Sequence, residues 1–161
     1  SFYANHHRVD TSIRIVLEGH PCPPRVLTYR GDSIGAIGGF DERSIAASIR
    51  TALAQGIHLD RDETIICNNG IEVTHRNFES VIKAAAIPGF YYLDKKGTDI
   101  RAVSFTSPAI FVMSDHKSMP RKSLHYLARL GGLPIALGPK TVFASQCVVL
   151  VHNELDRQAI Q

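Results

Sequence analysis

The chain has 161 residues, of which 44% are hydrophobic and 20% charged, and its formal net charge is +3. This length and ordinary composition suit one globular domain over residues 1–161 and exclude a largely disordered chain. No apolar run approaches the roughly 20 residues of a membrane-spanning helix, and no signal sequence opens the chain, so we expect a soluble cytoplasmic protein without a membrane partner.

The first half of the chain is predicted to contain two strands and a helix. Residues 12–17 and 25–30 have strand composition and are separated by a Gly/Pro-rich turn, so they form a hairpin or lie as neighbours. Residues 42–54 are predicted to be helical, because isoleucine and leucine recur there every four residues. Asp41 is the expected N-cap of this helix, and Gly56 lies near its end.

The rest of the chain repeats a strand, a polar loop and a helix. The predicted strands are 71–74, 89–93, 109–113 and 134–137, and the predicted helices are 78–86 and 123–130. Residues 148–151 favour a strand by propensity, whereas residues 143–155 keep helical spacing; we predict a helix from the period and the length.

This alternation predicts an α/β fold with a mainly parallel sheet flanked by helices. Ligands of such sheets usually bind beyond the carboxyl ends of the strands. The loops at 93–97, 114–120 and 137–142 are therefore the expected binding region.

Cysteine usage gives no sign of a metal site. Cys22, Cys67 and Cys147 are odd in number and far apart. Neither a disulfide framework nor a zinc cluster has this spacing, so we expect reduced thiols and no bound metal.

The three loops lie in segments that resemble signatures of one enzyme family. The segments are YYLDKKGTDI (91–100), FVMSDHKSMP (111–120) and IALGPKTVFASQCVVLVHNELD (135–156), and FDERSIAASIRTAL (40–53) resembles the family's Asp-Glu-Arg helix. In order and spacing they resemble the archaeal-type tRNA pseudouridine-54 N1-methyltransferases of the SPOUT superfamily and their bacterial relatives.

The resemblance implies a SPOUT methyltransferase fold with a C-terminal trefoil knot, a homodimer, and S-adenosyl-L-methionine as the cofactor. It also implies that the domain lacks an N-terminal strand and helix ahead of residue 1. The function it implies is methylation of N1 of pseudouridine in tRNA. Two alternatives keep the fold: a ribose 2'-O-methyltransferase, and an RNA-binding factor without turnover.

By the same resemblance, the cofactor contacts residues of the three loops. These residues are Leu93, Ser114, Leu137, Gly138, Pro139, Lys140, Thr141, Val142 and Cys147. Ser114 stands where the family has glycine, which argues against a contact through its side chain. Gly138 allows close approach of the backbone, and Pro139 fixes one dihedral angle. Cys147 is placed beside the cofactor without a covalent role, because a single cysteine on an apolar helix face is usually a small buried hydrophobe.

Methylation of N1 of pseudouridine must remove a proton, and a carboxylate can accept it. Asp41, in the Asp-Glu-Arg motif, is the first candidate for this base, and its alternative role is that of a helix cap. Arg43 is a candidate for contact with uracil or phosphate, or else a solvated surface residue. His116 could act as a base near neutral pH, although we favour a structural role.

Basic residues gather in loops beside the expected cofactor site. They are Lys95, Lys96, Arg101, Lys117, Arg121 and Lys122. We expect them to hold phosphates of the RNA, the alternative being that they are ordinary solubilising charges.

Overall fold

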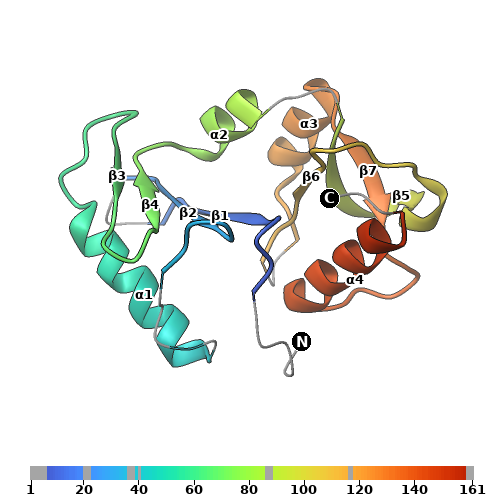
Figure 1. Ribbon diagram of the computed structural model, residues 1–161. Coiled ribbons are helices and arrows are strands. Elements are labelled where there is room, and N and C mark those ends of the chain that lie inside the picture. Colours follow the sequence, from blue (N-terminus) through green and yellow to red (C-terminus); the bar gives the residue numbers. More distant parts are fainter. Residues whose placement is uncertain are drawn as a thin grey trace. The chain divides into compact units, whose positions relative to one another are not determined.

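The computed structural model of the chain describes residues 7–19, 23–35, 39, 41–85, 89–115 and 118–158. It divides into two compact units, Ser1–Val81 and Ile82–Gln161, and the boundary falls within helix α2 (Phe78–Ala85). Each unit has its own sheet and its own apolar cluster (Figure 1). The single domain expected over residues 1–161 stays a prediction.

The first unit is built on an antiparallel sheet. Its strand order is β1 (Ser12–Leu17), β2 (Arg25–Arg30), β4 (Glu72–Thr74) and β3 (Thr64–Ile66). β1 and β2 pair along their whole length, which confirms the predicted neighbouring strands. The mainly parallel sheet expected from the sequence is wrong for this unit, because its strands are joined by connections that return the chain in the opposite direction.

Helix α1 (Glu42–Gln55) packs on β2 and β4 and encloses the core of this unit. Asp41 caps it as predicted, and Gly56 is the C-cap. Ala52 lies in an apolar cluster with Leu27 and Val73, which are buried completely on the facing strands. Burial of these three side chains fixes the helix on the sheet.

A buried arginine on β2 holds the end of α1. The side chain of Arg25 donates from Nε to the carbonyl oxygen of Gly56 at 3.0 Å and from Nη2 to that of Ile57 at 3.2 Å. Only 3% of Arg25 is exposed. The last carbonyl groups of a helix lack hydrogen-bond partners and carry partial negative charge. The guanidinium of Arg25 supplies both the missing donors and a compensating positive charge at this end.

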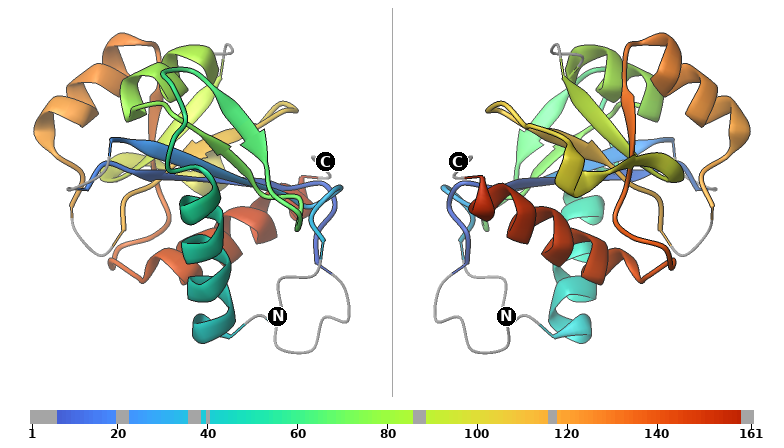
Figure 2. Two further views of the ribbon diagram at one scale, coloured as in Figure 1. Left: turned by 90° about the vertical axis from the view of Figure 1, so that its left-hand side faces the viewer. Right: turned by 90° about the vertical axis from the view of Figure 1, so that its right-hand side faces the viewer.

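The second unit contains a parallel sheet with helices, which confirms the α/β arrangement. The strand order is β6 (Ile110–Val112), β5 (Phe90–Asp99) and β7 (Leu133–Ala136). Helix α3 (Arg121–Arg129) connects β6 to β7, and α4 (Ala144–Arg157) follows β7. Figure 2 shows α3 and α4 on different sides of these strands.

Helix α4 settles the ambiguous last segment in favour of the helical period. Val151 is buried on α4, whereas Val149 is 62% exposed. In a strand, residues two positions apart face the same side and would share their burial, so the difference between Val149 and Val151 fits a helix.

Strand β5 extends further than predicted. It pairs with β7 up to Leu93 opposite Ile135, and the pairing resumes with Thr98 opposite the same Ile135. Residues 94–97 therefore form a bulge within a strand, so the independent loop expected at 93–97 is wrong. The charged composition hid the strand, because long-range pairing with β7 overrides local propensity.

Aromatic side chains fill the core of the second unit. The ring of Tyr91 meets that of Phe105 edge-on, with centroids 4.9 Å apart, and lies over that of Phe111 at 5.4 Å. Ile100, Ile135 and Val151 complete the buried cluster, so α4 covers this face of the sheet. Tyr91 itself is buried within its strand.

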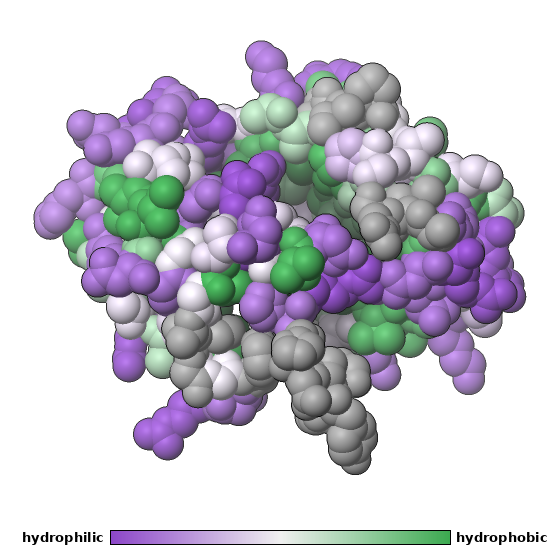
Figure 3. Space-filling view, in the orientation of Figure 1, coloured by the Kyte–Doolittle hydropathy of each residue, from purple (hydrophilic) through white to green (hydrophobic). Residues whose placement is uncertain are grey.

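Most of the surface visible in Figure 3 is hydrophilic, and apolar side chains form separate patches on it. Across the described ranges, no helix combines the length and the apolar character needed to cross a membrane.

Candidate functional site

The candidate cofactor site lies at the carboxyl edge of the parallel sheet in the second unit. Tyr92 of β5 is paired with Val112 of β6, and Leu93 is paired with Ile135 of β7. Because the three strands run in one direction, the bulge that follows Leu93 and the segments that follow Val112 and Ala136 lie towards the same edge of the sheet. That these segments together bind a cofactor stays a prediction.

Three of the expected cofactor residues stand just after these strand ends. Leu93, Ser114 and Leu137 are all half-buried. Leu93 and Leu137 pack against the same aromatic cluster, so they provide an apolar floor at this edge. Ligand sites are commonly lined in this way, with a few polar groups added.

The turn between β7 and α4 adds exposed backbone beside this floor. Gly138 has a φ of +148°, and a Cβ built on it would meet no atom within 4 Å. A ligand can therefore approach the Gly138 backbone closely, whereas a side chain would strain the backbone and fill that space. Pro139, Lys140 and Thr141 are exposed, and Val142 is half-buried.

Cys147 connects α4 to this turn. Its half-buried thiol donates to the carbonyl oxygen of Val142 at 3.9 Å. Burial raises the pKa of the Cys147 thiol, which is therefore protonated at neutral pH. A protonated thiol suits packing better than nucleophilic attack.

A glycine that the sequence interpretation missed shapes the bulge of β5. A Cβ on Gly97 would lie 2.5 Å from the backbone nitrogen of Ile135 and 2.5 Å from the carbonyl carbon of Pro134. The bulge can thus pack on β7 only with glycine at this position. The available signal was a glycine inside a strand pattern, which often marks a bulge or a close backbone approach.

Asp41, the expected base, lies in the first unit. Its Oδ1 accepts a hydrogen bond from the N–H of Ser44 at 3.0 Å, and its Oδ2 accepts one from the Ser44 hydroxyl at 2.6 Å. These bonds, chiefly the one from the hydroxyl, lower the pKa of the exposed Asp41 carboxyl. The cap is confirmed, and the catalytic role stays a prediction.

The basic residues expected to contact RNA fall in both units. Lys95 and Lys96 are exposed in the bulge of β5. Arg101 is also exposed, and its guanidinium donates to both carboxylate oxygens of Asp99, at 3.0 and 2.7 Å. This pairing compensates much of the charge of Arg101, so Lys95 and Lys96 are the stronger candidates of the three.

The other basic candidates differ in their settings. Arg43 is exposed in the first turn of α1, next to the Asp41 cap. Arg121 and Lys122 are exposed at the start of α3. Lys117 and His116 lie outside the described residues. Within the described part of the chain, no group of three or more His, Cys, Asp or Glu side chains could hold a metal ion.

A family model described as "Putative SAM-dependent RNA methyltransferase" matches residues 1–160, where SAM is S-adenosylmethionine. The chain belongs to this family. The family expected from the loop signatures is confirmed, and with it the cofactor and the RNA substrate class by which the family is described.

Proteins named "Putative pseudouridine methyltransferase" are similar to the chain over nearly all of its length. One from Shewanella baltica is 40% identical over 156 residues, which cover 96% of this chain and 79% of that protein. One from Vibrio cholerae is 37% identical over 158 residues, which cover 98% and 79%.

The crystal structure of Archaeoglobus fulgidus Nep1 bound to S-adenosylhomocysteine has a similar fold, with a TM-score of 0.57. The match covers 84% of this chain but only 58% of the Nep1 chain, at 11% sequence identity. This likeness shows a shared fold and nothing finer.

The residues at the sheet edge fit S-adenosylmethionine. Leu93 and Leu137 form an apolar surface of the kind against which an aromatic ring such as adenine can pack. The open backbone at Gly138 can hydrogen-bond the edge of that ring, since a backbone N–H and a carbonyl group supply both a donor and an acceptor.

Proposed function

We propose that this protein transfers the methyl group of S-adenosylmethionine to N1 of pseudouridine in RNA. The family match over residues 1–160 carries the proposal. Two further facts support it: the relatives are named as pseudouridine methyltransferases, and the three signature segments lie towards a common edge of the sheet.

The roles proposed for the chain's residues follow from the needs of this reaction. S-adenosylmethionine, when bound, supplies a methyl group attached to a positively charged sulfur. When the methyl group is transferred, the sulfur keeps the electron pair of the broken bond and becomes neutral, so no acid has to protonate it. Leu93 and Leu137 would exclude water from the adenosine part of the cofactor, and the turn at Gly138 would orient that part. N1 of pseudouridine carries a proton, and we assign Asp41 to accept it as the N1–methyl bond forms.

Two synthetic hairpin RNAs, identical except for pseudouridine or uridine at one loop position, test the proposal. We expect calorimetry to detect S-adenosylmethionine binding and mass spectrometry to find methylation of the base only in the pseudouridine RNA. Methylation of a ribose would favour a 2'-O-methyltransferase instead. RNA binding without S-adenosylmethionine binding would favour a non-catalytic RNA-binding factor.

We propose tRNA as the natural substrate, in the form of a pseudouridine in a loop. The support for this is the resemblance of the loop signatures to the tRNA-modifying enzymes. Methylation of tRNA transcripts containing pseudouridine, compared with ribosomal RNA fragments containing it, measures the preference. Faster methylation of the ribosomal fragments would overturn the tRNA assignment.

We also propose that the protein is a homodimer and that α4 contributes to the interface. Phe143, just ahead of α4, is 77% exposed, and Val149 and Leu150 on α4 are 62% and 40% exposed. Such apolar side chains are often covered by a partner. We further propose that the C-terminal segment forms the trefoil knot that the family resemblance implies.

Sedimentation at micromolar concentration tests the dimer. We expect the wild type to be dimeric and Val149→Lys to shift it towards monomers, because a charge would be buried at the interface. A monomeric wild type with full activity would overturn the proposal.

A further inference from the structure

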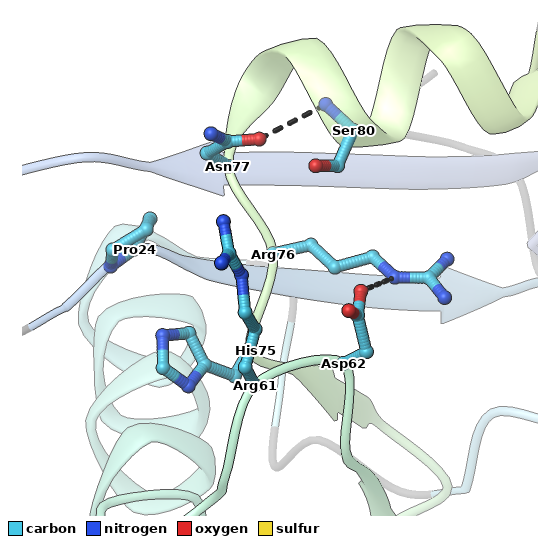
Figure 4. A pocket seen from close by; sticks show the side chains of 7 residues that line it. All are labelled: Pro24, Arg61, Asp62, His75, Arg76, Asn77 and Ser80. Carbon is cyan, nitrogen blue, oxygen red and sulfur yellow. Dashed lines mark hydrogen bonds and ion pairs between the residues drawn. The ribbon is translucent and has the colours of Figure 1, made fainter.

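A pocket of about 210 Å³ lies in the first unit, where the turn that precedes β3 meets the segment that precedes α2 (Figure 4). Arg61 and Asp62 line it from the turn, Arg76 and Asn77 line it from the segment that precedes α2, and Ser80 lines it from the first turn of α2. The pocket is smaller than the roughly 300–1000 Å³ of typical cofactor sites. It can hold a group the size of a phosphate, but not a whole adenosylmethionine.

Pairing of β3 with β4 builds this pocket. The N–H of Asp62 donates to the carbonyl oxygen of His75 at 3.0 Å, and the N–H of His75 donates to that of Glu63 at 3.0 Å. Asp62 has a φ of +66°, a conformation that aspartate tolerates better than most residues. Its carboxylate accepts a hydrogen bond from Nε of Arg76 at 2.9 Å, so the turn and the segment are joined by side chains as well.

The lining is rich in hydrogen-bond donors. Oδ1 of Asn77 accepts from the N–H of Ser80 at 2.9 Å, which leaves the amide NH2 of Asn77 able to donate. The Ser80 hydroxyl and the exposed Arg61 guanidinium add further donors. Arg76 lines the pocket and uses its Nε to donate to Asp62, so its terminal nitrogens carry further N–H donors that the Asp62 bond does not use.

The charge balance of the lining is positive. The lining contains two arginines and one aspartate. The His75 ring is held in place by a separate hydrogen bond, in which its Nδ1 donates to the carbonyl oxygen of Leu59 at 3.0 Å, because a carbonyl can only accept. Glu18 accepts from the N–H of Phe78 at 2.8 Å, so the first amide of α2 is already occupied. An anion in the pocket would therefore be held by side chains rather than by the end of the helix.

We propose that this pocket binds a backbone phosphate of the RNA substrate, an inference that rests on the proposed methyltransferase function. A phosphate offers only acceptor oxygens, which match a lining of arginine, amide and hydroxyl donors; a base edge would need acceptors as well. Phosphate contacts fix the register of an RNA without reading its sequence. The pocket thus positions the RNA and does not select the target base.

Two variants remove the proposed contact without disturbing the fold. Arg61→Gln deletes one exposed charge. Asn77→Asp keeps the acceptor for the N–H of Ser80, and thus the cap of α2, but replaces a donor by a negative charge. Arg50→Gln is the matched control, because Arg50 is an exposed arginine of the same unit that does not line the pocket. Thermal unfolding verifies that the three variants are folded.

The measurement is RNA affinity as a function of salt, with the pseudouridine hairpin and its uridine counterpart. For Arg61→Gln we expect an affinity loss of about three- to tenfold on both RNAs, and a salt dependence reduced by about one phosphate contact. Asn77→Asp should lose more, because it adds repulsion. Arg50→Gln should match the wild type, and adenosylmethionine affinity should be unchanged in all three.

The outcomes separate this inference from the proposed function. Wild-type RNA affinity and salt dependence in both pocket variants would overturn the phosphate site, even if the enzyme methylates pseudouridine. Pocket variants that lose affinity for inorganic phosphate or a free nucleotide but bind RNA as tightly as the wild type would also overturn it. RNA binding that weakens as expected, in a wild type that methylates nothing, would overturn the function while supporting the phosphate site.

Discussion

Gly138→Ala should weaken S-adenosylmethionine binding in addition to destabilising the fold. The φ of +148° is one that residues with a side chain rarely adopt, so the added methyl group should cost about 1–3 kcal/mol of folding free energy. The same methyl group would project into the open space at Gly138, where the cofactor is expected. A tenfold loss of affinity there corresponds to about 1.4 kcal/mol.

Gly131→Ala is the matched control. Gly131 also has a positive φ, +85°, and a Cβ on it would meet no atom within 4 Å, but it lies before β7 rather than after it. Both variants should therefore lose stability through backbone strain. Only Gly138→Ala should lose cofactor affinity as well.

Unfolding with and without the cofactor distinguishes the two effects. At a concentration 100 times the wild-type Kd, binding should stabilise the wild type and Gly131→Ala by about 2.7 kcal/mol. A tenfold weaker site should reduce this gain to about 1.4 kcal/mol in Gly138→Ala. If the cofactor stabilises both variants equally, Gly138 does not line the cofactor site.

Four other changes test the fold and the chemistry. Asp41→Asn should keep the α1 cap and the cofactor affinity but lower single-turnover methylation by roughly 10²-fold, with partial rescue at high pH; a wild-type rate would leave Asp41 as a cap alone. Arg25→Ala should destabilise the protein by about 3 kcal/mol in urea unfolding, because the buried carbonyl group of Gly56 and the part-buried one of Ile57 lose their partner. A change below about 1 kcal/mol would contradict this. Gly97→Ala should cost about 2 kcal/mol or more, because its Cβ would meet backbone atoms that cannot turn away; unchanged stability would show that the bulge can shift. Hydrogen bonds from Arg101 lower the pKa of Asp99 to about 2, so this pair's contribution should be full above about pH 4 and lost as the pH falls through about 2; Asp99→Asn should remove that part of the acid dependence in a pH titration of stability.

The sequence predicted best those elements whose local pattern agrees with their packing. Helix α1 begins after Asp41 as expected, because the cap residue and the apolar period point to the same start. Helix α4 followed its period although four successive residues favour a strand, since burial of Val151 on one face decides the outcome. The common edge of the three signature segments was also predictable, because parallel strands place their carboxyl ends together.

Elements that depend on distant partners were missed. Four of the six residues at 94–99 are charged, so the segment has little strand propensity, and it extends β5 because pairing with β7 resumes at Thr98. A glycine at position 97 is a signal for a bulge or a close backbone approach, but nothing local in the sequence identifies β7 as the strand it touches. The site was therefore predicted at the level of its segments, whereas the bulge that shapes one of them required the structure.

The phosphate pocket shows how one missed strand can hide a site. β3 has only three residues, Thr64–Ile66, too few for a recognisable alternation, so its pairing with β4 could not be foreseen. That pairing places Thr64 opposite Thr74, and the chain on either side is thereby brought together. Arg61 and Arg76 are 15 positions apart and look like separate solvated charges in the sequence, yet they line the same pocket. A basic cluster assembled across a hairpin is visible only once the strand register is known. The loss of RNA affinity in the pocket variants will show whether this cluster contributes to binding of the substrate.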